Sequence, residues 1–451
     1  MALILLSIPG LRQRDLSSMP KLRQLTRHGE QATLTPSFPC VTCPVQANMT
    51  TGKLPNQHGV IANGFYWRDK QKVEMWTAWN DVIEAPQIWD LLGQHGDELT
   101  TAVWFPLHSK GANADLICTP APVHNPDGSE SLWCYTRPTE LYGQLRDQLG
   151  HFPLQHFWGP LASINSTAWI VDSALIAARQ SQPQFFYIYL PHLDYAAQKF
   201  GPDSPAALAA LAELDEQIGK LSIGLQEAYK TSEHPHPDLL PKGDGVEWLI
   251  ASEYAVVPVD HVLYPNRLLR EAGLLKIHEE PDGEQLDFAA SRAWALVDHQ
   301  FSHIFTQPGD TAAIEEVRQL FDSHVGIAEV LSADQLARFH LNHLRSGNVV
   351  LISTPGSWQA YYWWLLDEKA PRFARTVDIH RKPGYDPVEL FFDPATRGIP
   401  LNAGLVCGSH GAPAENESQR GVILSSHGGL LGNQVLLDTQ VFDIALRYFG
   451  C

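Results

Sequence analysis

The sequence predicts an α/β fold with a mostly parallel central sheet and helices on both faces. Short apolar runs alternate with amphipathic stretches along the chain, which is typical of layered α/β domains. Hydrophobic residues make up 44% of the 451 residues and charged residues 18%, so the chain can bury a large core and is not predicted to be disordered. We expect a three-layer sandwich formed by one domain, residues 1–451, with insertions at about 116–158 and 265–345.

Seven short apolar runs bordered by polar stretches are predicted to be strands. They are Leu3 to Ile8, Thr101 to Phe105, Phe185 to Leu190, Trp248 to Ser252, Ala293 to Val297, Asn348 to Ser353 and Val422 to Ser425. Three helices are predicted where a capping residue precedes apolar residues at helical spacing. These helices cover 205–225 after Ser204, 314–320 after Asp310, and 442–449 after Asp438 or Thr439.

The net charge and the N-terminal residues indicate which partners and which compartment to expect. The formal charge is −18, with 32 basic and 50 acidic residues and no run of Lys or Arg, which argues against a nucleic-acid partner but permits a small anionic substrate in one pocket. The first residues lack the basic region and cleavage site of a signal peptide, and no apolar run approaches the roughly 20 residues of a membrane span. We therefore expect a cytoplasmic protein without a membrane partner.

The segment from Thr35 to Gly64 carries the most chemical information. Thr42 precedes a proline and a helix-like run that continues to Thr51, so its hydroxyl is expected at a helix N-terminus. The unpaired N–H groups and the dipole at that end of a helix stabilise an anion, and a phosphoryl group could dock there. Alternatively, Thr42 only caps the helix.

This segment resembles the nucleotide pyrophosphatase/phosphodiesterase branch of the alkaline phosphatase superfamily. The residues that match the family motif in order and spacing are Thr42, Pro44, Thr51, Gly52, Pro55, His58, Gly59 and Asn63. Further resemblances are the segment 189–202 with Asp194, the segment 250–254, Gly408 to Gly411 with His410, and Asp438-Thr439. The resemblance implies an alkaline-phosphatase-like sandwich in which Thr42 is the nucleophile and Asn63 binds a phosphoryl oxygen.

The resemblance also implies two divalent metal ions, usually zinc, but several ligand positions differ. Pro9 stands where an Asp is expected, Gln198 and Tyr254 stand where His is expected, and Glu253 replaces an Asp. Proline has no ligating side chain, and Gln and Tyr are weak zinc ligands beside His and carboxylates. Two interpretations stay open: other residues have rebuilt the metal site, or hydrolysis is lost and the pocket only binds a phosphorylated ligand or a partner.

Candidate replacements come from His and acidic residues at several places in the sequence. The candidate metal ligands are Asp194, His410, Glu253, His192, Asp298, His299, Asp378 and His380. Asp378 and His380 would share one face of an extended segment. Arg381 and Lys382 are candidates for binding substrate phosphate, although a basic pair is more often solvated surface. Histidines near a strand end, such as His299, are more often core or loop residues.

Together these observations predict a metal-dependent hydrolase of phosphate esters. The first interpretation is a phosphodiesterase or nucleotide pyrophosphatase that acts on a small phosphorylated substrate with two zinc ions, or manganese, as cofactors. A phosphonate or phosphomonoester hydrolase is the nearest alternative enzyme. A protein of the same fold that binds a phosphorylated ligand without catalysis is the alternative outside the enzymes.

Overall fold

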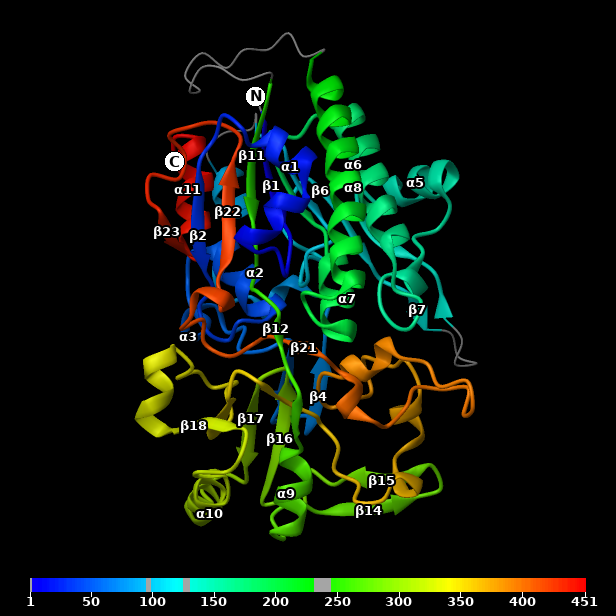
Figure 1. Cartoon of the computed structure of the whole chain (residues 1–451), viewed down its shortest axis with the longest axis vertical. Helices are drawn as coiled ribbons and strands as arrows, with labels where there is room; N and C mark the ends of the chain where they lie inside the picture. Colours follow the sequence, from blue (N-terminus) through cyan, green and yellow to red (C-terminus); the bar gives the residue numbers. More distant parts are fainter. Residues whose placement is uncertain (1, 95–98, 125–129, 231–244) are drawn as a thin grey trace.

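The computed structural model of the chain describes residues 2–94, 99–124, 130–230 and 245–451. These residues form two lobes, each with its own sheet and hydrophobic core (Figure 1). The first lobe, in the upper half of Figure 1, contains a nine-stranded sheet, and the second lobe below it contains a four-stranded sheet. The two lobes meet around β12 (Val257–Pro258) and β21 (Gly408–Ser409).

The sheet of the first lobe is mixed and mostly parallel, which confirms the predicted fold class. Its strands, in spatial order, are β23 (Val435–Leu437), β2 (Gln31–Thr35), β22 (Gly421–Ser425), β11 (Val246–Ala251), β1 (Ala2–Ser7), β10 (Phe185–Tyr189), β5 (Thr101–Trp104), β6 (Leu116–Pro120) and β9 (Cys134–Arg137). The run from β11 to β6 is parallel throughout, whereas β22 and β9 are antiparallel to their neighbours.

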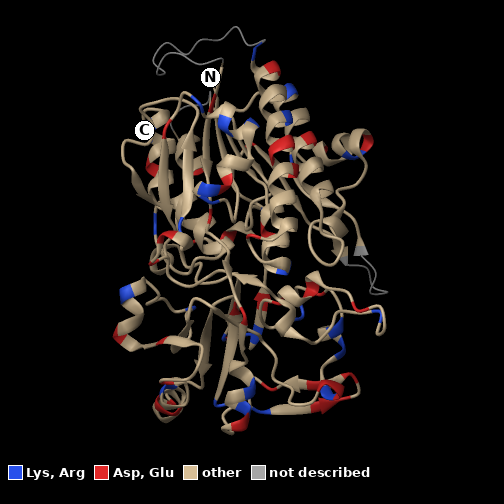
Figure 2. Ribbon diagram, in the orientation of Figure 1, with Lys and Arg blue, Asp and Glu red and all other residues tan. Residues whose placement is uncertain are grey.

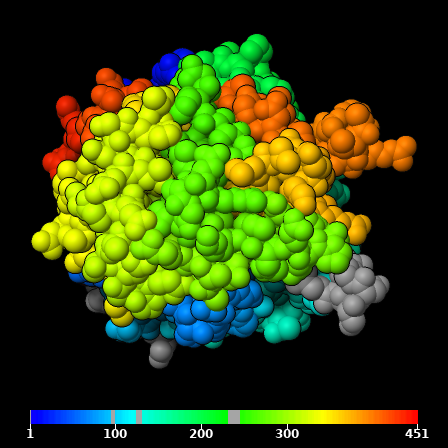
Figure 3. Space-filling view, turned by 90° about the horizontal axis from the view of Figure 1, so that it is seen from below, coloured from blue at the N-terminus to red at the C-terminus, as the bar shows by residue number. Residues whose placement is uncertain are grey.

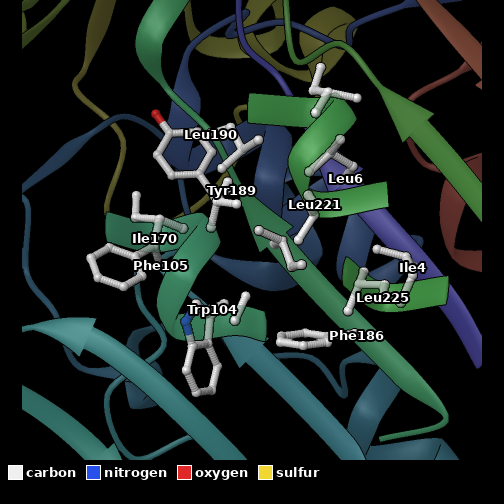
Figure 4. Close-up of a cluster of buried hydrophobic side chains, with 14 of the residues drawn as sticks. Ile4, Leu6, Trp104, Phe105, Ile170, Phe186, Tyr189, Leu190, Leu221 and Leu225 are labelled. Carbon is white, nitrogen blue, oxygen red and sulfur yellow. The ribbon is translucent and has the colours of Figure 1, made fainter. Parts of the chain in front are cut away.

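Helices cover both faces of this sheet. One face packs against α1 (Pro20–Leu25), α5 (Leu141–Leu149), α6 (Ile164–Ser181), α7 (His192–Phe200) and α8 (Pro205–Tyr229). The other packs against α2 (Thr42–Thr51), α4 (Ile88–Leu92) and α11 (Gln440–Tyr448). Figure 4 shows the first of these cores, where Ile4 and Leu6 of β1 lie beside Leu221 and Leu225 of α8. Alternation along β1 sends Leu3 and Leu5 into the opposite core.

The capping residues position two of the three predicted helices as expected. The Ser204 hydroxyl accepts a hydrogen bond from the Ala207 N–H at 3.1 Å, and an Asp310 oxygen accepts one from the Ala313 N–H at 2.9 Å at the start of α10 (Thr311–Phe321). The last helix begins after Thr439, whose side chain makes no capping bond.

The second lobe corrects the placement of two predicted strands. The segments 293–297 and 348–353 belong to an antiparallel sheet in the order β16 (Ala293–Asp298), β17 (Phe301–Thr306), β19 (Val349–Ser353) and β18 (Ile327–Ser332). Only residues 299–300 connect β16 to β17, and so short a turn joins antiparallel strands alone. Apolar runs do not distinguish which of two sheets a strand joins.

Several smaller elements complete the second lobe. They are α9 (Pro265–Glu271), the hairpin of β14 (Ile277–Glu280) and β15 (Gly283–Leu286), the pair of β13 (His261–Leu263) and β20 (Ser357–Gln359), and the hairpin of β3 (Gly64–Trp67) and β4 (Lys72–Met75). The predicted insertion at 265–345 lies in this lobe. The stretch 116–158, by contrast, supplies β6 and β9 to the central sheet and is no separate insertion there.

The surface shows the same division into lobes. Seen from below, the molecule presents mainly segments of the second lobe, in green, yellow and orange (Figure 3). In the view of Figure 2, Lys and Arg are interspersed with Asp and Glu over both lobes. Within the described part of the chain, no helix has the length and apolar character needed to cross a membrane.

Candidate functional site

Polar residues gather where the central strands of the first lobe end against the second lobe. Parallel strands place the residues that follow them at one edge of the sheet, and open α/β sheets bind their ligands there. The contributing segments are the end of β1 at Ser7, the α7 residue Asp194 after β10, Glu253 and Tyr254 after β11, the N-terminus of α2, the β16–β17 turn, and His410 after β21.

Thr42 is the first residue of α2 and is only 5% exposed. Val41 holds the capping position, and the Thr42 side chain makes no hydrogen bond to the backbone of the helix. Its hydroxyl oxygen instead lies 3.0 Å from the hydroxyl oxygen of Tyr254. The geometry therefore corrects the alternative that Thr42 is only a helix cap, because its side chain faces another functional group.

Asn63 is fixed beside Thr42 by three hydrogen bonds. Its Oδ1 accepts from the Cys43 N–H at 2.9 Å, which satisfies one free donor of the α2 N-terminus. Its backbone N–H and its Nδ2 donate to the two carboxyl oxygens of Asp298, at 2.7 and 3.0 Å. An amide nitrogen carries two hydrogens, so Nδ2 keeps one for a further acceptor.

Glu253 lies in the strand-end segment that follows β11 and contacts α2 through Gln46. Its Oε1 accepts hydrogen bonds from the Ser7 hydroxyl and from Gln46 Nε2, both at 2.7 Å. Gln46 belongs to α2 and in turn accepts a bond from the Leu107 N–H at 2.8 Å. The second oxygen, Oε2, is buried without a hydrogen-bond partner.

Asp194 and His410 face each other with one unpartnered atom each. Asp194 Oδ1 and His410 Nε2 are 3.8 Å apart, and both are buried without a hydrogen bond. The remaining polar atoms are engaged: Gln198 Nε2 donates to Asp194 Oδ2 at 2.6 Å, and His410 Nδ1 lies 2.9 Å from the Cys40 carbonyl oxygen. Gln198 Oε1 accepts a bond from the Tyr385 hydroxyl at 2.6 Å.

Four rings form a continuous stack through the centre of the site. Tyr254 stacks on His410 with ring centroids 3.6 Å apart and an interplanar angle of 7°. His410 contacts His299 at 3.8 Å, and His299 stacks on Tyr385 at 3.7 Å. The two-residue turn after β16 presents His299 with a φ of 57°, a left-handed conformation that is uncommon for residues other than glycine. The stack joins side chains from both lobes.

Burial controls the ionisation of these groups. It raises the pKa of Asp194 to about 7, of Asp298 to about 7 and of Glu253 to about 8, against the opposing effect of their hydrogen-bond donors. It lowers the pKa of His410 to about 3. Among the described residues, no Lys or Arg pairs with the three carboxyl groups. The site therefore favours neutral forms over charged ones.

The structure does not bring the other predicted residues into this site. His192 pairs with Glu213 of α8, with 2.8 Å between Nε2 and Oε2. Asp378 lies in a turn, not in an extended segment, because its Oδ1 accepts a bond from the Arg381 N–H. His380 lies in the same turn and is exposed.

The predicted basic pair is also placed differently from the expectation. Arg381 forms an ion pair with Asp378, and Lys382 is buried between Asp386 and Glu389, with Nζ–O distances of 2.7 and 2.6 Å. The charge of Lys382 is thus balanced by two carboxyl groups of its own turn. His303 is a core residue, which agrees with the alternative interpretation of histidines near a strand end. Its ring nitrogens bond the Ile61 carbonyl and the Gly347 N–H.

The donor set does not fit the predicted pair of metal ions. Within the described ranges, no group of three or more His, Cys, Asp or Glu side chains is placed to hold one. Both polar atoms of Gln198 are bonded to protein groups, and both oxygens of Asp298 accept from Asn63. Asp194 with His410, 3.8 Å apart, and Asp298 with His299, 3.6 Å apart, keep the chemistry and the spacing of ligand pairs, but within the described ranges no third such residue joins either pair.

A comparison with protein families identifies the relationship. The sequence profile described as type I phosphodiesterase / nucleotide pyrophosphatase matches residues 3–386. The chain belongs to this family. Its members generally use divalent metal ions.

Curated relatives carry names from the same family. The chain is 28% identical over 229 residues to an uncharacterised pyrophosphatase/phosphodiesterase of Schizosaccharomyces pombe, covering 50% of this chain and 41% of that protein. It is 26% identical over 237 residues to a bis(5'-adenosyl)-triphosphatase of Xenopus laevis, covering 50% of this chain and 43% of the other. The chain thus spans less than half of the length of these two curated relatives.

Solved structures share the whole fold at low sequence identity. Murine ectonucleotide pyrophosphatase/phosphodiesterase 5 superposes with a TM-score of 0.62 at 14% identity, over 100% of this chain and 95% of that one. Phosphonoacetate hydrolase from Sinorhizobium meliloti superposes with a TM-score of 0.64 at 16% identity, over 99% and 95%. These similarities show that both lobes together have the fold of these two proteins.

Sequence patterns missed three residues that support the site. Ser7 and Gln46 hold Glu253, and Tyr385 closes the ring stack. Gln46 lies inside the motif segment, four residues after Thr42, so helical spacing could have placed it beside the nucleophile. Ser7 and Tyr385 carried no such signal, because their partners lie far away in the sequence.

Proposed function

We propose that the chain hydrolyses phosphate esters or pyrophosphate bonds of small phosphorylated compounds, with Thr42 as the nucleophile. The observation that carries this proposal is the placement of the Thr42 hydroxyl at the N-terminus of α2, next to an Asn63 that Asp298 and Cys43 hold rigidly. A fixed hydroxyl beside a fixed amide donor provides an attacking oxygen and a hydrogen bond for a phosphoryl oxygen.

The reaction proceeds in two balanced steps. Thr42 Oγ1 forms a bond to phosphorus while the bond to the leaving oxygen breaks. The Thr42 proton passes to the Tyr254 hydroxyl, which gives its own proton to the carboxylate of Asp194, and the leaving oxygen takes a proton from solvent. Water then attacks the phosphothreonine and the bond between phosphorus and Thr42 breaks. The proton on Asp194 returns through Tyr254 to Thr42, and the protons of the attacking water stay with the phosphate product and solvent. The second N–H of Asn63 Nδ2 donates to a phosphoryl oxygen in both steps. The donor set fits no pair of zinc ions, so we assign no step to a metal.

Similar proteins support this class of substrate. One solved structure is that of an inactive threonine-to-alanine variant of murine ectonucleotide pyrophosphatase/phosphodiesterase 5 in complex with AMP. Another is phosphonoacetate hydrolase in complex with phosphonoacetate. We infer that the ligand of this chain is likewise a small molecule with a phosphoryl or phosphonyl group, which leaves nucleotide diesters and phosphonates as the first substrates to test.

The test is hydrolysis of a chromogenic phosphodiester by the wild-type protein and by Thr42→Ala. We expect the substitution to lower kcat by at least about 1,000-fold, because no other hydroxyl replaces the attacking oxygen. Thr51→Ala removes a hydroxyl of the same helix that bonds the Ala47 carbonyl, and serves as the matched control. Full turnover by a folded Thr42→Ala protein contradicts the proposal.

A second candidate is a protein that binds a phosphorylated ligand without turnover. The changed residues Pro9, Gln198 and Tyr254 favour it, because they remove metal ligands from the pocket. Binding of AMP or inorganic phosphate by the wild-type protein, with no hydrolysis of phosphodiester, monoester or phosphonate substrates, would select this candidate over the enzyme.

A further inference from the structure

Among the described residues, the Tyr254 hydroxyl makes the one side-chain hydrogen bond to the Thr42 hydroxyl. The two oxygens are 3.0 Å apart, and either can donate. Tyr254 is 1% exposed, and its ring is held by His410 at 3.6 Å with nearly parallel planes. Because the ring cannot rotate away from that stack without displacing His410, its hydroxyl is a fixed part of the nucleophile's surroundings.

The ring stack also fills the space between the remaining ligand-type residues. Tyr254, His410, His299 and Tyr385 follow one another at centroid distances of 3.6 to 3.8 Å, which leaves no gap for an ion between the rings. The lone pairs of an imidazole lie in the plane of its ring, so only the ring edges could reach an ion, and His410 Nε2 and His299 Nδ1 are buried there without a partner. The contacts between the rings fix the directions in which these two nitrogens point.

Asp194 and Glu253, at the edges of the stack, are each held by protein hydrogen bonds through one carboxyl oxygen, while the other oxygen of each is buried without a partner. Gln198 connects Asp194 to Tyr385, with bonds of 2.6 Å on both sides. Glu253 is held by Ser7 and Gln46 at 2.7 Å through one oxygen. An ion placed at Asp194 would have to break the bond from Gln198 or accept two protein ligands, which is fewer than zinc sites use.

We propose that the Thr42 site of this chain works without a two-metal centre, and that Tyr254 is the residue that positions the Thr42 oxygen in place of an ion. The absence of a two-metal centre follows from the donor set of the described residues. The positioning role of Tyr254 rests on the proposed function, so an experiment can contradict one claim without the other.

The first test measures bound zinc and needs no activity. The protein is dialysed against excess zinc and then against zinc-free buffer, and zinc is determined by elemental analysis. We expect fewer than about 0.2 zinc ions per wild-type chain. The variant Gln198→His supplies a third ligand beside Asp194 and His410, which are 3.8 Å apart, and is expected to retain about 1 zinc ion.

The matched control for this test is Gln148→His on the exposed surface of α5, which adds a histidine away from the site and should retain no more zinc than the wild type. About 2 zinc ions on the wild-type chain would overturn the proposal. Zinc near zero on both wild type and Gln198→His would support the absence of a metal centre and would show that one added histidine does not restore it.

The second test concerns positioning. Tyr254→Phe keeps the ring and the stack on His410 but removes the contact with Thr42. We expect kcat to fall about tenfold with KM unchanged, since a hydrogen bond to the nucleophile is lost while substrate contacts remain. The control Tyr362→Phe removes a buried, unpartnered hydroxyl in the core of the second lobe.

The outcomes of the two tests separate the claims. An unchanged kcat in Tyr254→Phe, or a loss that appears equally in KM and in thermal stability, would contradict the positioning role. Absence of any wild-type hydrolysis would contradict the proposed function but would leave the zinc result intact. Calorimetric binding of inorganic phosphate in the presence of a chelator would then show whether the metal-free pocket still takes a phosphoryl group, and loss of that binding on chelation would overturn the proposal.

Discussion

Two sides of one site differ in how completely their polar atoms are satisfied. On the nucleophile side, which comprises Asn63, Asp298 and the Cys43 N–H, each oxygen and nitrogen that holds Asn63 has a partner. The other side adjoins the changed residues Gln198 and Tyr254 and is called the replaced side here. Its residues Asp194, Glu253, His299 and His410 each keep one buried atom without a partner. Hydrogen bonds hold the first side rigid, and contacts between aromatic rings hold the second.

This difference predicts how each side responds to substitution. Hydrogen bonds that position a nucleophile must be kept together, because removing one leaves a buried donor unsatisfied. Unpartnered atoms impose no such constraint on their neighbours, so residues around them can change with less effect on stability. Substitutions on the two sides should therefore differ in how far they lower the free energy of unfolding.

The largest effect is expected at Asp298. Asp298→Ala leaves the backbone N–H and Nδ2 of Asn63 buried without acceptors, so we expect the free energy of unfolding to fall by about 3 to 5 kcal/mol. Chemical denaturation measures the change. Asp260→Ala, an exposed acidic residue of the second lobe, is the control and should change it by less than about 0.5 kcal/mol. A small effect at Asp298 would remove the claimed difference between the two sides.

Acid should weaken the nucleophile side through His303. This buried residue bonds the Ile61 carbonyl two residues before Asn63, and burial lowers its pKa to about 4. Below pH 6.5 the unfolded chain takes up a proton that the folded chain refuses until about pH 4, so stability falls across that window, by about 3 kcal/mol in total.

The measurement for His303 is the difference in unfolding free energy between wild type and His303→Gln from pH 7 to pH 4. We expect the variant to lose less stability over this range than the wild type. His278→Gln, on an exposed hairpin, is the control and should follow the wild-type curve. Parallel curves for wild type and His303→Gln would show that this histidine is not held neutral by the fold.

A moderate effect is expected at Asp438, which anchors α2 and the loop before it. Asp438 accepts hydrogen bonds from the Ser37 N–H, the Ser37 hydroxyl and Asn48 Nδ2, at 2.9, 2.6 and 2.7 Å. Asp438→Asn sets an amide N–H against at least one of these donors and should cost about 2 kcal/mol. Thermal unfolding measures the loss. An unchanged midpoint would mean that the anchor does not hold α2.

The smallest effect is expected at Glu253 on the replaced side. Glu253→Gln keeps an acceptor oxygen for Ser7 and Gln46 and changes only an atom that has no partner. We expect the unfolding free energy to change by less than about 1 kcal/mol. A loss as large as that at Asp298 would show that Oε2 has a structural role, and the comparison of the two sides would fail.

Much of the fold and half of the site could be predicted from the sequence. The segment from Thr42 to Asn63 is continuous, so its spacing alone places Thr42 at a helix start. The replaced side is assembled from residues such as Asp194, His299 and His410 that come from both lobes, and only the packing decides which of them meet. The extended segment expected at Asp378 is a turn, because a local Asx-type bond from the Arg381 N–H forms where alternation suggested a strand.

The lobes show the same limit on a larger scale. β16 and β19 have the same buried apolar pattern as β1 and β10, and their sequences do not encode membership of a second sheet. The information lies in the two-residue connection at His299, whose left-handed backbone had no glycine to reveal it. Turn geometry of that kind is visible only in the folded chain.

If Tyr254 takes the place of an ion at Thr42, hydrolysis by the wild-type protein requires no metal ion. The decisive measurement is the rate of phosphodiester cleavage by protein treated with excess chelator, compared with the same protein after zinc or manganese is returned. We predict equal rates in both states, with Thr42→Ala inactive in each. Cleavage that disappears with the chelator and returns with the metal would contradict the claim that Tyr254 replaces an ion at Thr42.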